Sequence, residues 1–112
     1  MISKALTAAS TKPIILTILK EGEDYGYNII QRVKDLSKGS LEWSDGMLYP
    51  VLQRMEKEGL IVSRWNISKE GRHRKYYKIT EEGRKELETE MNQWGDIIGA
   101  LSKLWKPLPT AE

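Results

Sequence analysis

The cationic side chains of this chain gather in one short segment. Residues 69–80 hold five basic side chains, one acidic side chain, a histidine and a tyrosine pair, which gives the segment a charge of +4. By contrast, the whole chain of 112 residues has a net charge of only +2, and residues 81–112 carry −3. A dense basic patch beside tyrosines is typical of a surface that binds polyanions. The alternative is a solvated turn whose charges only keep the protein in solution.

The composition excludes several other kinds of chemistry. The chain has no cysteine and a single histidine, His73. It therefore has no disulfide, no thiolate nucleophile, no cysteine-ligated metal and no two-histidine metal motif within one chain. The sequence also lacks a recognisable nucleophile–base set and a phosphate-binding loop. We therefore expect no enzymatic activity, no metal site and no cofactor.

The hydropathy pattern gives an expectation about location. The longest unbroken apolar runs have three residues, as in residues 14–16, whereas a membrane-spanning helix needs about 18 apolar residues. The N-terminal segment lacks the basic and then apolar pattern of a signal peptide. We expect a single-domain cytoplasmic protein with no membrane partner.

The first apolar segment predicts the first helix. Residues 14–19 are apolar almost all round, Pro13 suits a first helical turn, and Thr11 could cap it. Whether residues 2–10 form an earlier part of this helix is left open, and one helix kinked at Pro13 is the preferred form. Gly22 is a suitable helix stop.

Two more helices are predicted before the pattern changes. Asp24 could cap a helix that ends at residues 37–40, and residues 41–43 are too short for anything but a small strand. Ser44 is expected to cap a third helix, which runs to about Glu58. The face of this helix opposite its apolar side is small and polar near its N-terminal end, and consists of Gly46, Pro50, Gln53 and Lys57.

After Gly59 the apolar pattern changes to a period of two. Residues 60–68 predict a strand, the Lys-Glu-Gly sequence after them predicts a turn, and residues 74–80 predict the returning strand. The +4 segment is therefore the tip and return arm of a hairpin. We expect Trp65 on the first strand, like Trp43 before the third helix, to pack in the core.

The last helix carries the most regular spacing in the sequence. Thr80 and two acidic residues open it. A stripe of about 25 residues is about 37 Å long, which is more than three short helices and a hairpin would cover. We expect the excess to be buried against a second copy, and a helix packed only on its own domain is the alternative. The predicted dimer seam, with heptad spacing, is Leu87, Met91, Trp94, Ile98, Leu101 and Trp105.

This element order predicts a winged helix-turn-helix, in a mainly α (α+β) chain. Residues 1–80 would form the DNA-binding domain, with the first helix contributing to the dimer, and residues 81–112 the C-terminal dimerisation helix and tail. In such folds the third helix enters the major groove and the hairpin, or wing, contacts phosphates. The expected DNA-binding residues are Ser44, Gly46, Tyr49, Pro50, Gln53, Arg54, Lys57, Arg72, His73, Arg74 and Lys75.

Some of these side chains have a second role open to them. Tyr49 could bind a phosphate or shield the seam between helix and hairpin, and Arg54 could bind a phosphate or pair with Glu58. Pro50 could shape the first turns of the helix without touching DNA. His73 could be a solvated residue or add affinity when it is protonated.

Three segments resemble the PadR family of bacterial transcriptional regulators. They are Tyr-Gly-Tyr-Asn-Ile-Ile at 25–30, the sequence from Leu-Tyr-Pro to Glu-Gly-Leu-Ile at 48–61, and Gly-Arg-His-Arg-Lys-Tyr-Tyr-Lys-Ile-Thr-Glu-Glu-Gly at 71–83. The short length and single C-terminal helix look like the compact subfamily that includes multidrug-sensing repressors. The resemblance implies a homodimer joined through its first and last helices. It also implies a repressor of a DNA operator, relieved by an aromatic or hydrophobic effector.

The resemblance also implies an effector site at the dimer centre. In the multidrug-sensing members a tryptophan of the last helix stacks on planar drugs, and Trp94 is at the matching position, although core or dimer packing is its alternative role. Ile98 stands where those regulators can have an acid, which argues against a preference for cationic drugs, although Asp96 lies nearby in sequence. A winged-helix module that binds protein instead of DNA is the competing function. The implied effector site is Leu6, Ala9, Pro13, Trp94, Ile97 and Ile98.

Overall fold

The structure is a computed structural model in which residues 1–107 and 109 are described. The described residues form four helices and one three-stranded antiparallel sheet, which confirms the predicted mainly α (α+β) class and the winged helix-turn-helix. The strand order in the sheet is β1-β3-β2. In chain order the elements are α1 (Lys4–Lys20), β1 (Asp24–Tyr25), α2 (Gly26–Leu36), α3 (Asp45–Lys57), β2 (Ile61–Ile67), β3 (His73–Ile79) and α4 (Glu81–Leu104).

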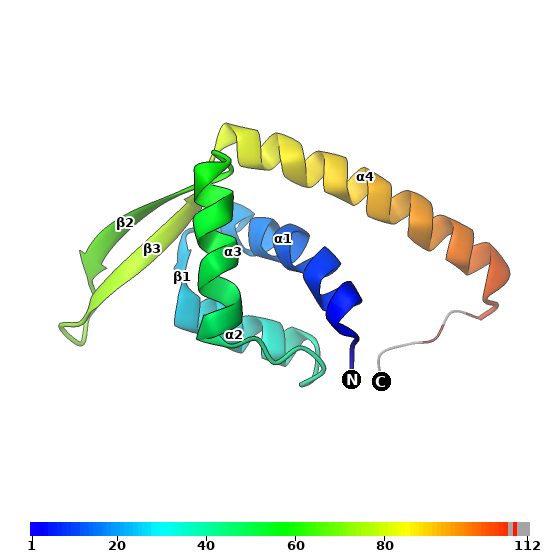
Figure 1. Cartoon of the computed structure of the whole chain (residues 1–112), viewed down its shortest axis with the longest axis horizontal. Helices are drawn as coiled ribbons and strands as arrows, with labels where there is room; N and C mark the ends of the chain where they lie inside the picture. The colour runs from blue at the N-terminus through cyan, green and yellow to red at the C-terminus, as the bar shows by residue number, and fades with distance from the viewer. Residues whose placement is uncertain (108, 110–112) are drawn as a thin grey trace.

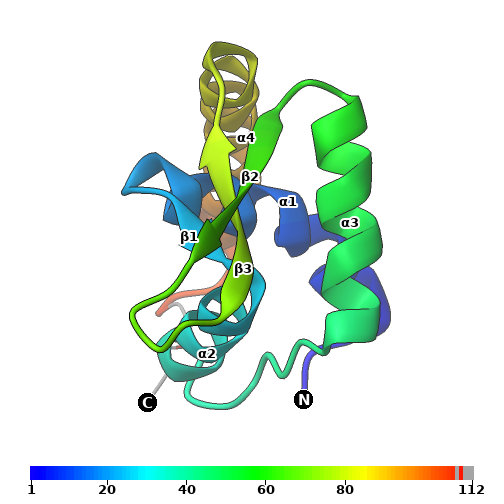
Figure 2. The same ribbon diagram turned by 90° about the vertical axis from the view of Figure 1, so that its left-hand side faces the viewer.

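Figures 1 and 2 show how these elements are arranged in space. The helices α1, α2 and α3 surround one core, and the β2–β3 hairpin projects from one end of the molecule. From the base of the hairpin, α4 runs along α1 and continues past it to the opposite end. The molecule measures 51 × 29 × 22 Å along its principal axes. The hairpin tip and the C-terminal half of α4 are therefore at opposite ends of its longest dimension.

The core lies where the three short helices meet the base of the hairpin. Its centre is made of aliphatic side chains from α1, α2, α3 and β2. Leu16, Ile29, Leu48, Leu52 and Ile61 are each 0% exposed. Leu87 near the start of α4 also belongs to this core, so the first part of α4 packs on its own domain.

Local hydrogen bonds begin α3 and α4 where the sequence predicts. Ser44 Oγ accepts from the backbone N–H of Met47 at 3.2 Å, and Thr80 Oγ1 accepts from that of Gly83 at 3.0 Å. Gly59 follows α3 with a left-handed φ of 79°. These bonds fix the starts of α3 and α4, which carry the predicted DNA-binding face and dimer seam.

The predicted hairpin is confirmed. β2 and β3 pair from Ile61 opposite Ile79 to Ile67 opposite His73. Gly71 in the turn has a φ of 80°, which favours glycine because other side chains meet a steric penalty there. The +4 segment therefore forms the turn and the return strand, as expected.

The first helix, α1, begins before the apolar segment of residues 14–19 and includes Pro13. Ser3 caps it by accepting from the N–H of Leu6 at 3.2 Å. Thr11, predicted as a cap, instead donates its hydroxyl to the carbonyl of Thr7 at 2.6 Å inside the helix. The cap prediction was wrong because the preceding residues, rich in alanine, continue the helix and Pro13 removes only one backbone donor. Within the described residues no helix combines the length and hydropathy needed to cross a membrane.

The small strand was predicted at the wrong place. Residues 41–43 form no strand, and Leu41 and Trp43 are instead buried in the core. The short strand is β1, which pairs with the free edge of β3. Asp24 lies in β1 and does not cap α2, since its carboxylate accepts from the N–H of Tyr25 and from Asn28, each at 2.9 Å.

Candidate nucleic-acid interface

The polar stripe predicted on the third helix is on the surface of α3. The opposite side of α3 packs in the core through Leu48 and Leu52. α3 remains one helix through Pro50, which itself is exposed. A helix with this exposed face could approach base edges closely, because its first turns carry no large side chain on that side. The exposed stripe is Gly46, Pro50, Gln53 and Lys57.

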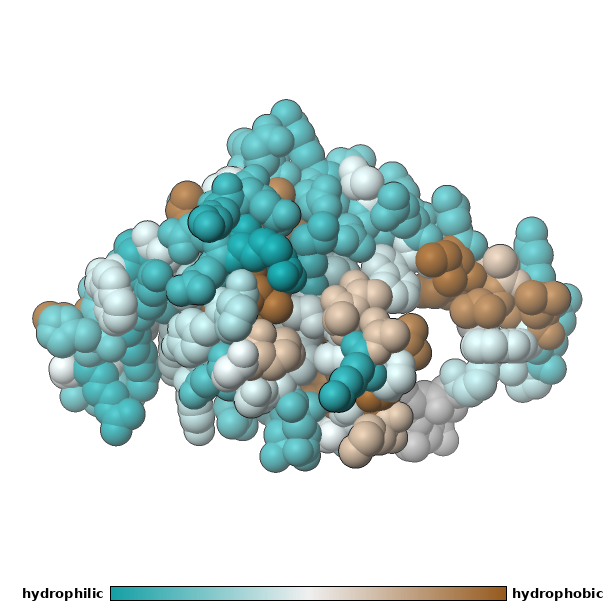
Figure 3. Space-filling model, viewed as in Figure 1, coloured by the Kyte–Doolittle hydropathy of each residue, from teal (hydrophilic) through white to brown (hydrophobic). Residues whose placement is uncertain are grey.

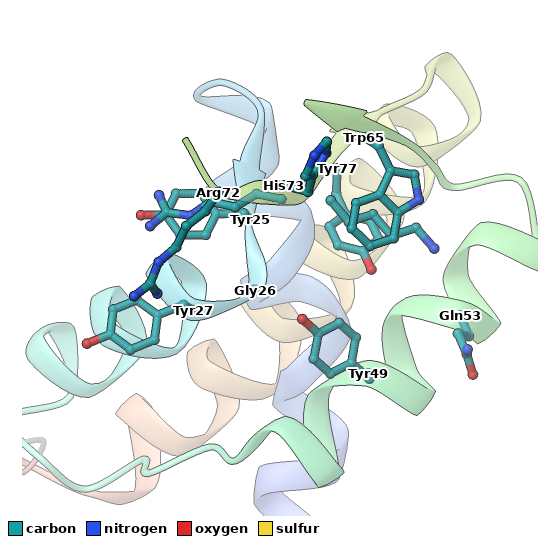
Figure 4. A pocket seen from close by; sticks show the side chains of 11 residues that line it. Tyr25, Gly26, Tyr27, Tyr49, Gln53, Trp65, Arg72, His73 and Tyr77 are labelled. Carbon is teal, nitrogen blue, oxygen red and sulfur yellow. The ribbon is translucent and has the colours of Figure 1, made fainter. Parts of the chain in front are cut away.

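A hollow of about 670 Å³ separates α3 from the hairpin, which we call the wing (residues 61–79) (Figure 4). Its lining comes from α3, from the start of α2 and from the wing. It brings together six of the predicted DNA-binding residues on two elements that are far apart in sequence. They are Tyr49 and Gln53 of α3 and Arg72, His73, Arg74 and Lys75 of the wing.

The remaining predicted residues lie outside this hollow. Arg54 and Lys57 line a second hollow along the C-terminal half of α3, of about 740 Å³. The alternative pairing of Arg54 with Glu58 does not form: no ion pair joins them in the described part of the chain. Ser44 uses its hydroxyl oxygen as the helix cap and lies outside both hollows.

Aromatic rings hold two of the wing cations in place. The guanidinium carbon of Arg74 lies 4.3 Å from the centre of the Tyr25 ring, and Lys75 Nζ lies 5.8 Å from that of Tyr77. Tyr25 in turn packs edge-on against Tyr76, with ring centres 5.4 Å apart. A ring orders a cation without cancelling its charge. These cations therefore stay available to a polyanion.

Not every basic residue of the wing is available in the same way. Arg64 is paired through two hydrogen bonds with the carboxylate of Glu23, which raises the pKa of the guanidinium. At the tip, hydrogen bonds from its own backbone and from Ser68, helped by Arg74, lower the pKa of Glu70. The wing therefore keeps one carboxylate charged at neutral pH, and Arg64 has an acidic partner inside the molecule.

Tyr49 fills the corner between α3 and α2. Its hydroxyl lies 3.3 Å from where a Cβ at Gly26 would stand, so glycine makes room for the ring. The ring therefore packs beside α2, and it also remains partly exposed in the hollow between α3 and the wing, so both predicted roles stay open to it. Figure 4 shows the hydroxyls of Tyr49 and Tyr77 pointing into the hollow from opposite sides.

Trp65 is the main site residue that the sequence did not reveal. It was expected in the core, but it is 67% exposed and lines the hollow beside the wing cations. The prediction was wrong because β2, at seven residues, extends about 23 Å and so outreaches the helices that could cover it. Trp43, by contrast, is buried as predicted. The length of β2 relative to a small core is the sequence signal that could have distinguished the exposed Trp65 from the buried Trp43.

A separate, apolar groove lies between α1 and α4, away from both of the hollows beside α3. It has a volume of about 380 Å³ and is lined by Pro13, Trp94 and Ile98 of the predicted effector residues. The other three, Leu6, Ala9 and Ile97, do not line this groove of the single chain.

A chain of polar contacts connects this groove to the packing of α1 on α4. Lys12 Nζ lies 2.5 Å from Glu86 Oε2 and 3.3 Å from Glu90 Oε2, and the hydrogen bond to Glu86 raises the pKa of Lys12. Glu90 also accepts from the indole N–H of Trp94 at 3.1 Å. The orientation of Trp94 is thus connected, through Glu90, to the contact between the two helices.

Comparisons with known proteins agree with this geometry. A model of the transcriptional regulator PadR-like family matches residues 15–89. An uncharacterized protein of Lysinibacillus sphaericus is 33% identical over 84 residues, which are 75% of this chain and 77% of that protein. The transcriptional regulator YqjI of Escherichia coli is 31% identical over 80 residues, which are 71% of this chain but only 37% of that protein.

Solved structures extend the similarity beyond the matched segment. A PadR-like transcriptional regulator from Bacillus cereus superposes with a TM-score of 0.80 and 32% identity, covering 90% of this chain and 96% of that one. A PadR family transcription regulator from Clostridium difficile has a TM-score of 0.75 and 31% identity, covering 85% and 97%. The chain therefore shares nearly its whole fold with these regulators.

Proposed function

We propose a homodimeric repressor function for this chain, which belongs to the PadR-like family of DNA-binding transcriptional regulators and is not an enzyme. In this proposal two copies bind a palindromic operator in duplex DNA, and a small aromatic effector at the dimer interface weakens that binding. The residues expected to contact DNA are those predicted on α3 and the wing.

The observation that carries the proposal is the hollow between α3 and the wing. Its cations come from the wing, and the polar side chains of α3 stand across from them. A DNA backbone strand carries one charge per phosphate, so a groove lined by cations on one side and a polar helix face on the other fits a strand with base edges beyond it. The arrangement supports both backbone contact and readout by Gln53, which can pair with adenine.

Removing wing cations tests this assignment. Lys75→Ala should weaken binding to a duplex selected from a random pool. It should also make the slope of log K against log salt less steep by about 1.8, because each of the two subunits loses one phosphate contact and each contact contributes about 0.9. Lys85→Ala is the matched control, since Lys85 is a cation on α4 that lies 3.6 Å from Glu82. Fluorescence anisotropy between about 50 and 200 mM salt measures both quantities. Equal slopes for Lys75→Ala and the wild type would contradict the assignment of the wing.

The exposed apolar face of α4 supports the homodimer. Met91, Ile98 and Trp105 of the predicted seam are exposed in the single chain, whereas Leu87 is buried in the chain's own core. Apolar side chains repeated on one helical stripe are typical of an interface between helices. The proposed seam therefore begins at Met91 and continues toward the end of α4.

Trp94 is the proposed stacking residue for the effector. Its groove is mostly apolar, and its indole is oriented by Glu90, so a planar aromatic compound could stack on the ring. Such compounds should quench the Trp94 fluorescence of the wild type. The quenching should also occur in Trp65→Phe, which removes a distant tryptophan on the wing. A Trp94→Ala protein that dimerises and binds these compounds with unchanged affinity, measured by calorimetry, would contradict the stacking role.

The spacing of the two DNA-binding faces supplies the proposed coupling. Two recognition helices must be about 34–36 Å apart to enter successive major grooves. α1 and α4 form both the effector groove and the proposed dimer interface, so a ligand that moves them changes this spacing. A preference of about 1–3 kcal/mol for the non-binding arrangement would change operator affinity about 5- to 150-fold.

A further inference from the structure

We propose that Trp65 of the wing contacts DNA directly, its indole packing on the sugar edge of the strand that passes between the wing and α3. The inference rests on the proposed DNA binding and assigns a role to a residue that the composition of the wing would not suggest. Its partner is the apolar part of the DNA backbone, not the phosphate.

The alternation of β2 shows which way Trp65 points. Ile61 is in the core, and Ser63 donates its hydroxyl to Glu56 of α3 at 2.7 Å, so the odd-numbered residues face α3. Trp65 and Ile67 continue the same face, but they lie beyond the helix and are 67% and 59% exposed. An apolar strip of the wing therefore faces the hollow, which α3 lines from the other side with Tyr49 and Gln53.

The neighbours of this strip are cationic. In the β2–β3 register Trp65 stands opposite Lys75, and Ile67 stands opposite His73. Figure 4 shows Trp65 beside Tyr77 at the edge of the hollow, with Gln53 and Tyr49 on the α3 side. A protein partner would favour an apolar strip without flanking cations, whereas a DNA strand presents phosphates and apolar sugar edges in alternation. The pairing of Trp65 with Lys75 fits that alternation.

The rest of the described chain leaves Trp65 uncovered, since its side chain is 67% exposed. Figure 3 shows the wing end as mainly hydrophilic, while the apolar atoms gather over the distal part of α4 at the other end. An indole left this exposed is stabilised by removal from water when a partner covers it. The charge of the wing selects a polyanion as that partner.

Salt dependence separates this role from that of the cations. Trp65→Ala should bind the selected duplex, of about 30 base pairs so that two half-sites fit, about 10-fold more weakly than the wild type. Its slope of log K against log salt should equal that of the wild type, because no charge is removed. Lys75→Ala should make that slope less steep, because it removes a phosphate contact.

Val62→Ala is the matched control. Val62 is an apolar residue of the same strand, 50% exposed, on the opposite face beside Arg64. Its truncation should leave duplex affinity unchanged. An equal loss for Val62→Ala and Trp65→Ala would overturn the proposal, because it would show a general effect on the wing.

Fluorescence gives a second readout that does not depend on truncation. Acrylamide quenching of the wild type should fall when the duplex is added, and this fall should be absent from Trp65→Phe. Duplex affinity of Trp65→Ala within twofold of the wild type, or unchanged acrylamide quenching in the complex, would overturn the inference while leaving DNA binding intact. Failure of the wild type to retain any duplex from the pool would instead overturn the proposed function, and this inference with it.

Discussion

At the scale of single residues, Tyr77 links the core of the fold to the hollow between α3 and the wing. The ring is 1% exposed, and its burial, with smaller effects of Tyr49 and Glu56, raises the pKa of its phenol from 10.0 to about 12. The folded chain therefore retains this proton at pH values where the unfolded chain has lost it. The corresponding stability is fully present below about pH 10 and is lost as the pH rises to about 12.

Tyr77→Phe isolates this contribution. A pKa difference of about 2 corresponds to about 3 kcal/mol, so the free energy of unfolding of the wild type should fall by up to this amount over the alkaline range. The variant should show a smaller fall, because phenylalanine has no proton to lose. Urea unfolding at about pH 9 and about pH 11.5 measures the difference. Identical pH dependence in the two proteins would contradict the role given to Tyr77.

The limits of sequence reasoning at this scale are clear from two pairs of residues. Trp43 and Trp65 are the same residue type beside short apolar segments, yet the core covers one and leaves the other exposed. Arg64 and Arg74 both belong to the wing, but a carboxylate holds one and a tyrosine ring holds the other. In both pairs the difference comes from contacts with distant parts of the chain. Residue type indicated the chemistry available to the wing, but not which side chains are free to use it.

At the scale of elements, the join between α4 and the hairpin depends on the absence of a side chain at Gly83. A Cβ there would stand 2.1 Å from the carbonyl oxygen of Leu60 and 2.7 Å from Cγ1 of Ile79. The backbone of Leu60 cannot move away without disturbing the start of β2. The close approach of the first turn of α4 to the hairpin therefore requires glycine.

Two glycine substitutions on the same helix should consequently have opposite effects. Gly83→Ala should lower the free energy of unfolding by about 1–3 kcal/mol or more, since an added methyl in a tight contact forces backbone shifts. Gly99→Ala would place its methyl group in open space, so it should raise stability by up to about 1 kcal/mol through helix propensity. Urea unfolding of both variants checks the signs. If Gly83→Ala left the free energy of unfolding unchanged, α4 would be able to shift on the hairpin.

Local signals were sufficient for most of the elements. Caps at Ser44 and Thr80 and the change to a period of two after Gly59 depend only on neighbouring residues, and they placed α3, the hairpin and α4 correctly. β1 could not be predicted in this way. A strand of two residues has no periodicity, and it exists because the edge of β3 is free to pair with it.

At the scale of the whole molecule, opposite ends have opposite character. Apart from the strip of Trp65 and Ile67, the wing end is mainly hydrophilic and cationic, whereas the distal part of α4 is apolar (Figure 3). The small net charge of +2 conceals this separation. A long, narrow chain with one apolar end and one cationic end is suited to join a second copy at one end and DNA at the other. Sequence periodicity predicted the seam, but not that its first member, Leu87, is covered by the chain's own core.

A charge placed in the seam tests whether the apolar part of α4 joins two copies of the chain. Ile98 is 51% exposed in the single chain, so Ile98→Glu should fold normally while placing a buried, unpaired carboxylate in each half of the proposed dimer interface. We expect the wild type to be a dimer by light scattering and the variant to be largely monomeric at micromolar concentration. Operator affinity should fall strongly as well, because two half-sites are then bound independently and the gain from linking them is lost.

Gln93→Glu provides the matched control for charge alone. Gln93 is exposed on α4 between Met91 and Trp94, off the heptad positions of the seam, so it receives the same negative charge outside the interface. This variant should remain dimeric and bind DNA like the wild type. A monomeric Gln93→Glu would show that charge anywhere on α4 prevents association. A dimeric Ile98→Glu would instead show that the apolar stripe of α4 is not the surface through which two copies meet, since an uncompensated carboxylate at the centre of a helical seam cannot be accommodated without separating the helices.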